Sequence, residues 1–164
     1  MIAAILKETT AGENRVSATP QTVKELIKSG LTVRVQTGAG DASHYPDQDY
    51  QNAGAEICAD AAATSANANI ILKVASPTLE EMDLIPNGSA FVSLFQTTRE
   101  IEQVKALTNK NITGFSMHLI PRTTLAQSMD ALSSQANIAG YKSVLIGAAP
   151  VSYTHLTLPT NREV

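Results

Sequence analysis

The sequence predicts an α/β fold with a mostly parallel, flavodoxin-like or Rossmann-like sheet of about four or five strands, flanked by helices. Short apolar runs alternate with segments of helical spacing along most of the 164 residues, as β-α-β units do. The composition, with 43% hydrophobic and 16% charged residues, is typical of a globular domain. The length is sufficient for one such domain with a real core.

The first predicted strand covers residues 2–6, which form a continuous apolar run. Thr19 and Pro20 then supply a helix N-cap and a proline at the first helical position. The helix that follows is expected to stop at Gly30, because glycine commonly terminates helices. Residues 31–36 are short and rich in β-branched side chains, so they predict the second strand.

The alternation continues through the rest of the domain. The remaining predicted elements are a weak helix at residues 47–53, a strand at 70–74, a short helical turn between Pro77 and Pro86, a strand at 90–95, a helix at 98–109 and a strand at 112–117. A long helix rich in alanine, serine and leucine is expected over residues 126–149. It follows the last predicted strand, and a helix in this position often leads into a second domain.

Three regions follow from this pattern. Residues 1–125 are predicted to form the α/β domain, and residues 126–149 a connecting helix. Residues 151–164 change to a threonine-rich sequence in which Pro159 blocks helix continuation. The string VSYTHLTLPT resembles the translated read-through of a transposase sequencing adapter. We interpret this tail as artefactual or disordered and exclude it from the fold.

Charge and composition exclude several classes of function. The net charge of −3 argues against a nucleic-acid partner, which would require a basic patch. The apolar run at the N-terminus is interrupted at Lys7, too early for a signal peptide, and no run approaches the length of a membrane span. Cys58 has no partner for an internal disulfide, which fits a reducing compartment.

Two sequence patterns that could form a ligand-binding or metal-binding site are interpreted as structural. Gly38-Ala39-Gly40 follows a strand, but a dinucleotide fingerprint needs a third glycine where Ser43 stands, so a tight turn is favoured over a phosphate loop. His44, His118 and His155 lack the spacing of metal ligands, and we predict no metal site.

Residues 121–134, PRTTLAQSMDALSS, concentrate polar groups after a strand end, where open α/β sheets place their ligand crevices. On a helix, Gln127, Asp130 and Ser133 would share a face. Arg122 can pair with phosphate, while carboxylate, amide and hydroxyl groups can bind ribose hydroxyls and a carboxamide. The alternative is a capped helix start in which Asp130 only favours the helix dipole.

At this segment the sequence resembles a known family. PRTTLAQSMDALSSQANIAGYK is similar to the loop-and-helix signature of the alpha subunit of proton-translocating NAD(P) transhydrogenase. KETTAGENRVSATP, SGLTVRVQTGAG, AGAEI and ANIILKV agree in the same order, so the resemblance extends to about residue 149. It implies that Arg122, Gln127, Asp130 and Ser133 contact NAD(H) near the nicotinamide and its ribose, with Gln127 positioning the nicotinamide.

The resemblance also implies hydride transfer from NADH to NADP+ held by a separate component, with no catalytic acid or base in this chain. Other transhydrogenase components, including a membrane subunit, are the implied partners, together with a homodimer. The implied location is cytoplasmic, peripheral on the inner membrane. A Rossmann domain with its own G-x-G-x-x-G motif would follow, so we expect a truncated fragment that is inactive alone.

Alanine dehydrogenase is the competing family, because it shares the same two-domain plan. The resemblance to this family includes Arg15 in ENRVSATP and Lys73 in IILKV. In alanine dehydrogenase the matching arginine and lysine bind and process the amino-acid substrate. It also uses a histidine where this chain has Gln96, which cannot transfer a proton at neutral pH. We favour the transhydrogenase and interpret Arg15 and Lys73 as structural. A non-catalytic scaffold or dimerisation fragment is the alternative from another class.

Overall fold

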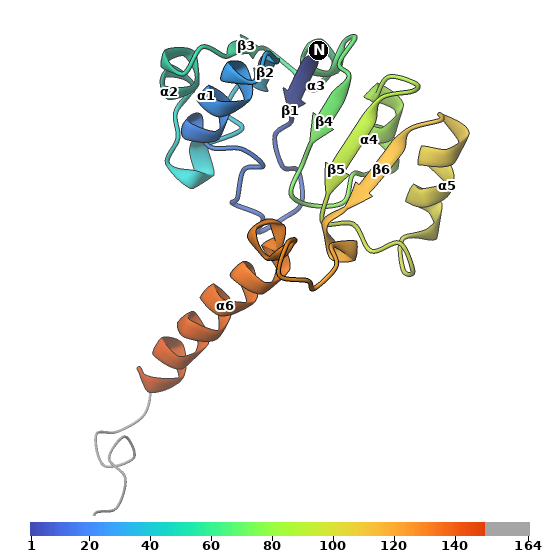
Figure 1. Ribbon diagram of the computed structural model, residues 1–164. Coiled ribbons are helices and arrows are strands. Elements are labelled where there is room, and N and C mark those ends of the chain that lie inside the picture. Colours follow the sequence, from blue (N-terminus) through green and yellow to red (C-terminus); the bar gives the residue numbers. More distant parts are fainter. Residues whose placement is uncertain (150–164) are drawn as a thin grey trace, which may run out of the picture. The chain divides into compact units, whose positions relative to one another are not determined.

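The computed structural model describes residues 1–149 and confirms the predicted fold class. Within these residues, parallel strands form one sheet in the order β3-β2-β1-β4-β5-β6 (Figure 1). This is the Rossmann strand order. Successive strands are added on one side of β1 up to β3, and on the other side from β4 onward, so the order reverses between β1 and β4. The strands are β1 (Ile2–Ile5), β2 (Thr32–Gln36), β3 (Glu56–Cys58), β4 (Ile70–Leu72), β5 (Ala90–Ser93) and β6 (Thr113–Ser116).

The described residues form two compact units, Met1–Leu119 and a segment that begins at Ile120. The first unit contains the sheet, and the second contains the longest helix. The helices are α1 (Pro20–Lys28), α2 (Asp47–Asn52), α3 (Ala61–Ser65), α4 (Leu79–Leu84), α5 (Ile101–Asn109) and α6 (Ala131–Ala148), with short 3-10 turns η1 (Asp41–Ser43), η2 (Met117–Leu119) and η3 (Gln127–Met129).

Strand alternation divides the core of the first unit between the two faces of the sheet. Ala3 and Ile5 of β1 point into a cluster shared with α1 and α2. Ala4 of the same strand points into the opposite cluster, which includes residues of α4 and α5. Side chains of β1 are buried on both faces, as expected for a central strand of a parallel sheet.

Helix α1 begins where the sequence predicts. Thr19 takes an extended conformation, and its hydroxyl accepts a hydrogen bond from the backbone N–H of Thr22. Pro20 occupies the first helical position, and Gly30 follows the helix with a φ of +88°. The predicted start and stop of this helix are therefore confirmed to within two residues.

Strand β3 and helix α3 were missed, because each is too short to display a hydrophobic period. Strand β3 pairs with β2 in parallel, and Arg34 of β2 forms an ion pair with Glu56 of β3 at 3.0 Å. Helix α3 is specified by its cap, since the side chain of Asp60 accepts from the backbone N–H of Ala63. Within residues 1–149 the sheet consequently has six strands rather than the predicted four or five.

The Gly38-Ala39-Gly40 segment is a structural turn, in agreement with the sequence interpretation. Gly38 has a φ of +68°, and its backbone N–H donates to Asp47 of α2 at 2.9 Å. Gly40 is required for space rather than torsion, because Tyr50 of α2 packs directly against it. The buried hydroxyl of Tyr50 donates to the carbonyl of Ala18, which ties α2 to the start of α1.

Replacing Gly40 with alanine is expected to lower the free energy of unfolding by about 1–3 kcal/mol. A Cβ atom there would lie 2.5 Å from the carbonyl oxygen of Tyr45 and 2.7 Å from the ring of Tyr50. Gly140→Ala is the control, because a Cβ on that helical glycine meets nothing within 4 Å. Urea unfolding followed by circular dichroism measures both variants. Equal midpoints for Gly40→Ala and the wild-type chain would contradict the packing described here.

No helix within residues 1–149 combines the length and the apolar character that crossing a bilayer requires. The tail predicted at residues 151–164 lies outside the described residues.

Candidate functional site

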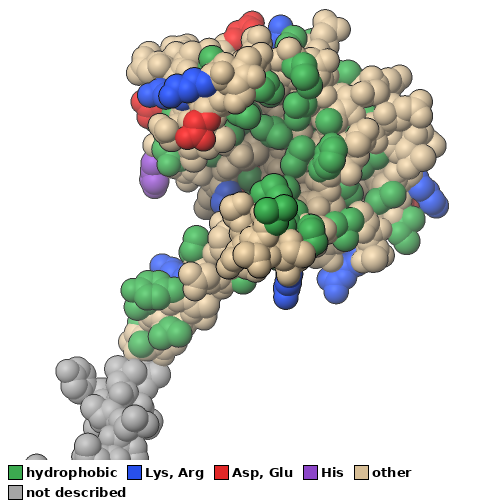
Figure 2. Space-filling view, in the orientation of Figure 1, with side chains coloured by type: hydrophobic (Ala, Val, Ile, Leu, Met, Phe, Trp, Pro, Cys, Tyr) green, Lys and Arg blue, Asp and Glu red, His purple; other side chains and the backbone are tan. Residues whose placement is uncertain are grey.

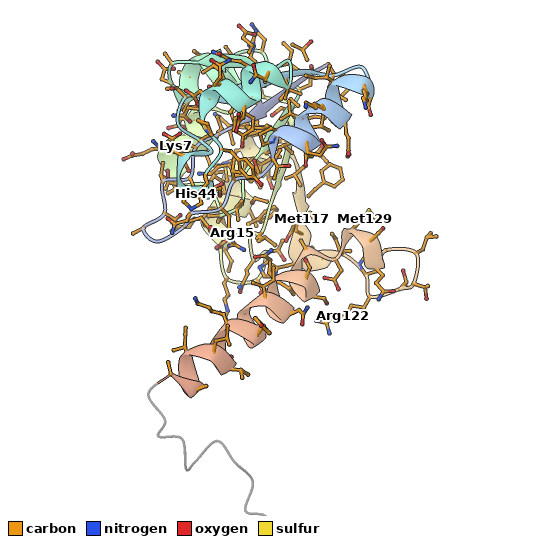
Figure 3. All side chains as sticks on the ribbon, turned by 90° about the vertical axis from the view of Figure 1, so that its left-hand side faces the viewer. Lys7, Arg15, His44, Met117, Arg122 and Met129 are labelled. Atoms are coloured by element: carbon orange, nitrogen blue, oxygen red, sulfur yellow. The ribbon has the colours of Figure 1, made fainter. Side chains whose placement is uncertain are left out.

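The polar segment identified in the sequence forms a chain of tight turns before α6. The backbone N–H of Ala126 donates to the carbonyl of Thr123, and that of Met129 donates to Ala126. The sequence pattern predicted that the long helix begins at residue 126, but helix α6 begins at Ala131. The cause is Asp130, whose backbone leaves the helical region with a ψ of +79°. Arg122 and Met129 mark this turn segment in Figure 3.

Asp130 is the N-cap of α6. One carboxylate oxygen accepts from the backbone N–H of Ser133 at 3.0 Å, and the other accepts from the Ser133 hydroxyl at 2.5 Å. The hydrogen bonds from Ser133 and the charge of Arg122 hold the pKa of Asp130 below its usual value. The carboxylate therefore remains ionised at neutral pH, and each oxygen keeps capacity for one further donor.

The turn segment and the first two turns of α6 enclose an open pocket of about 570 Å³. The residues that line it are all polar or charged, namely Arg122, Thr123, Thr124, Gln127, Asp130, Ser133, Ser134 and Asn137. The pocket thus brings together the predicted residues Arg122, Gln127, Asp130 and Ser133. Ser134 lies at the end of the polar segment identified in the sequence, whereas sequence reasoning missed Asn137, although its spacing from Ser133 and Ser134 places it on the same helix face.

The lining offers partners for phosphate, hydroxyl and carboxamide groups of a ligand. Arg122 offers a cationic donor for phosphate, and Asp130 offers acceptors for ribose hydroxyls. Gln127 and Asn137 contribute carboxamides that can both donate and accept. The volume lies within the range of small-molecule pockets, about 300–1,000 Å³. Among the lining residues, Arg122 and Asp130 alone are ionisable.

A second group of charges lies at the carboxyl ends of β1 and β4, where the strand order reverses. The ammonium of Lys73, which follows β4, is fully buried and lies 2.7 and 2.8 Å from the two carboxylate oxygens of Glu81. Glu8, which follows β1, lies 3.8 Å from the same ammonium. The Glu8 carboxylate also accepts from the backbone N–H groups of Val74 and Ala75, which joins the ends of the two strands.

Burial has opposite net consequences for the two carboxylates of this cluster. Burial raises the pKa of Glu8, and the bonds from Val74 and Ala75 only partly offset it. Burial also opposes ionisation of Glu81, but the hydrogen bonds from Lys73 and from the backbone of Thr78 outweigh it. They hold the pKa of Glu81 below its usual value. Glu81 is therefore the principal counter-ion of Lys73.

The other positions shared with alanine dehydrogenase are also engaged by neighbours. The guanidinium of Arg15 forms two hydrogen bonds with Glu13, at 2.8 and 2.6 Å. Gln96 follows β5, and its backbone N–H donates to Glu100 at 2.9 Å. Across residues 1–149, no three His, Cys, Asp or Glu side chains gather closely enough to hold a metal ion.

Comparisons with known proteins relate the chain both to transhydrogenase subunits and to alanine dehydrogenases. A family model described as "Alanine dehydrogenase/PNT, N-terminal domain" matches residues 4–139. The chain is 40% identical to the NAD(P) transhydrogenase subunit alpha of Haemophilus influenzae, over 90% of this chain and 28% of that protein. It is 32% identical to the alanine dehydrogenase of Bacillus subtilis, over 90% of this chain and 38% of that enzyme.

Among solved structures, the crystal structure of transhydrogenase from Sinorhizobium meliloti superposes with a TM-score of 0.86 at 40% identity. That similarity covers 90% of this chain and 44% of the other chain. The chain therefore spans less than half the length of these relatives.

Proposed function

The chain belongs to the family of alanine dehydrogenase/PNT N-terminal domains, and from that premise we propose that its pocket at residues 122–137 binds the nicotinamide half of NAD(H). The observation that carries the proposal is the convergence of Arg122, Gln127, Asp130 and Ser133 on one pocket. Each of these side chains comes from the segment that the sequence singled out on chemical grounds. Similarity to transhydrogenase subunit alpha at 40% identity supports the choice of ligand.

Each lining residue has a distinct proposed task. Arg122 neutralises a phosphate, and Asp130 accepts hydrogen bonds from the ribose hydroxyls with the capacity that Ser133 leaves free. Gln127 fixes the carboxamide and hence the orientation of the nicotinamide ring. When bound, NADH supplies a hydride, and the chain itself contributes binding, orientation and exclusion of water.

We extend the proposal to the assembly in which this domain acts. The domain serves the NAD(H) side of a proton-translocating transhydrogenase, and hydride passes to NADP+ on a separate component. Its partners are the other transhydrogenase components, including a membrane subunit, and a second copy in a homodimer. This assignment places the domain peripherally, on the cytoplasmic side of the inner membrane. The relatedness to transhydrogenase subunit alpha supports this reading.

Three observations favour a transhydrogenase role over an amino-acid dehydrogenase role. Gln96 stands where the dehydrogenase resemblance requires a proton-transferring histidine. The ammonium of Lys73 is buried and already bonded to both oxygens of Glu81, so it is not presented to a substrate. The identity is also higher to the transhydrogenase subunit, at 40%, than to the alanine dehydrogenase, at 32%.

The Arg122→Ala variant tests the proposal. We expect it to weaken NADH binding by about tenfold, because a charge-assisted hydrogen bond to phosphate is lost. The measurement is the fluorescence of the reduced nicotinamide during titration, which is undisturbed by tryptophan because the chain contains none. A pocket of this size supplied by one segment should bind with a Kd on the order of 1 mM.

Arg99→Ala is the matched control, because Arg99 is exposed and lies outside the pocket, so this substitution removes the same charge without changing the lining. The control should leave the affinity unchanged. Equal losses in the two variants would indicate non-specific attraction of an anion and would contradict the assigned site. The absence of saturable binding to the wild-type chain would instead favour a scaffold role.

A further inference from the structure

The N-cap and the first two turns of α6 present one continuous polar face to the pocket. Asp130, Ser133, Ser134 and Asn137 follow one another at helical spacing, and all of them line the pocket. Asn137 is the most distant of them from the N-cap, one turn beyond Ser133 and Ser134. The pocket therefore extends along the helix, past the residues that a capping function would require.

Hydrogen-bond capacity differs sharply along this face. The carboxylate of Asp130 can only accept. The hydroxyl of Ser133 donates its proton to Asp130, and that of Ser134 donates to the carbonyl of Ala131 at 3.2 Å. Each hydroxyl has one proton, so both retain acceptor capacity only. Within residues 1–149, the amide of Asn137 forms no hydrogen bond, so its two N–H groups are the free donors of the face.

We propose that Asn137 determines specificity for the pyridine carboxamide, an inference that rests on the proposed binding of NAD(H). A primary carboxamide has two acceptor positions on its oxygen and two N–H donors. One opposing amide can pair with half of these groups, and Asn137 and Gln127 together can pair with all of them. Asn137 donates to the ligand oxygen and accepts from the ligand nitrogen, which no other residue of the α6 face can do.

This pairing predicts discrimination against ligands that lack the amide nitrogen. A site built to hydrogen-bond an N–H group is left with an unpaired acceptor when the ligand carries a methyl group instead. The 3-acetylpyridine analogue of NADH has that replacement and is otherwise the same molecule. ADP-ribose lacks the pyridine ring altogether and therefore reports binding by the remainder of the pocket.

The test compares three ligands on the wild-type chain, on Asn137→Ala and on Ser143→Ala. NADH affinity is measured by nicotinamide fluorescence, and the other two ligands by displacement of NADH. We expect the wild-type chain to prefer NADH to the acetylpyridine analogue by about tenfold. Asn137→Ala should remove this preference by lowering NADH affinity alone, with ADP-ribose affinity unchanged. Ser143→Ala is the matched control and should preserve the preference, because Ser143 lies on the same helix, donates to the carbonyl of Gly140 and does not line the pocket.

Two results would overturn the inference while the proposed function stands. One is a preference for NADH that survives in Asn137→Ala. The other is an equal loss of NADH and ADP-ribose binding in that variant, which would reveal a structural role. A wild-type chain that shows no saturable NADH binding, or whose binding is insensitive to Arg122→Ala, would overturn the proposed function and this inference together.

Discussion

Replacing Glu81 with alanine is expected to lower the free energy of unfolding by about 3–5 kcal/mol, because it leaves a buried lysine without its main counter-ion. The side chain of Lys73 is 0% exposed, and both oxygens of Glu81 lie within 2.8 Å of its ammonium. Glu8 cannot substitute fully, since it lies 3.8 Å away and is held by two backbone N–H groups. Urea unfolding at pH 7 measures the loss.

Two controls separate the ion pair from other roles of Glu81. Thr78→Ala removes the reciprocal capping box between Thr78 and Glu81, and should cost only about 1 kcal/mol. Glu80→Ala removes an exposed charge from the same helical turn and should be nearly neutral. A Glu81→Ala chain as stable as Glu80→Ala would show that the buried pair contributes little.

The pH dependence of the Glu81 effect has a definite sign. The folded-state pKa of Glu81 lies below its ordinary value of 4.5, so its ionised form stabilises the fold above that pH. This contribution is lost as the pH falls through the folded-state pKa. Glu8 acts in the opposite sense, because its pKa is raised and protonation relieves the cost of its burial. The difference between wild type and Glu81→Ala should therefore shrink below pH 4.5.

The largest expected effect on binding comes from Asp130→Asn, which should weaken NADH binding by about 10- to 100-fold. Asparagine is as good an N-cap as aspartate, so α6 should begin at the same residue. The variant loses the negative charge, and an NH2 group that cannot accept replaces one of the two carboxylate oxygens that accept from Ser133 and from ribose hydroxyls. Nicotinamide fluorescence gives the affinity, and far-ultraviolet circular dichroism verifies that helix content is retained.

Ser128→Ala is the matched control for Asp130→Asn, because Ser128 lies in the same turn segment but does not line the pocket. Because the pKa of Asp130 is lowered, its carboxylate stays charged and the wild-type affinity should be constant between about pH 6 and 9. Unchanged affinity in Asp130→Asn would mean that Asp130 serves the helix alone.

The fold was largely predictable from local signals, and the exceptions have physical causes. Pro20 with its Thr19 cap and the apolar runs of β1, β4 and β5 specify their elements within a few neighbouring residues. Strand β3 contains three residues and is stabilised by pairing with β2, which no local period encodes. The start of α6 was misplaced because Asp130 ends the preceding turn and caps the helix instead of continuing it.

The candidate site was only partly predictable, for a related reason. Arg122, Gln127, Asp130 and Ser133 lie close in sequence, but spacing alone favoured a capped helix start, and the family resemblance was needed to select these four residues. Asn137 lies one turn further and carries no distinctive signal until its free amide is seen. The pairing of Glu8 with the segment after β4 joins residues 66 positions apart in the chain. Only the order of strands in the sheet brings them together.

The most direct test of the proposed NAD(H) site is a two-dimensional 15N–1H NMR titration of the chain with NADH. The proposal predicts saturable shifts concentrated in the backbone amides that surround the pocket, namely those of Arg122, Thr123, Thr124, Gln127, Ser133, Ser134 and Asn137. Shifts confined to a different surface pocket, the one between α1 and α2 that Lys24 and Asp49 line, would contradict it. So would a spectrum that does not change at NADH concentrations of about 10 mM, tenfold above the expected Kd.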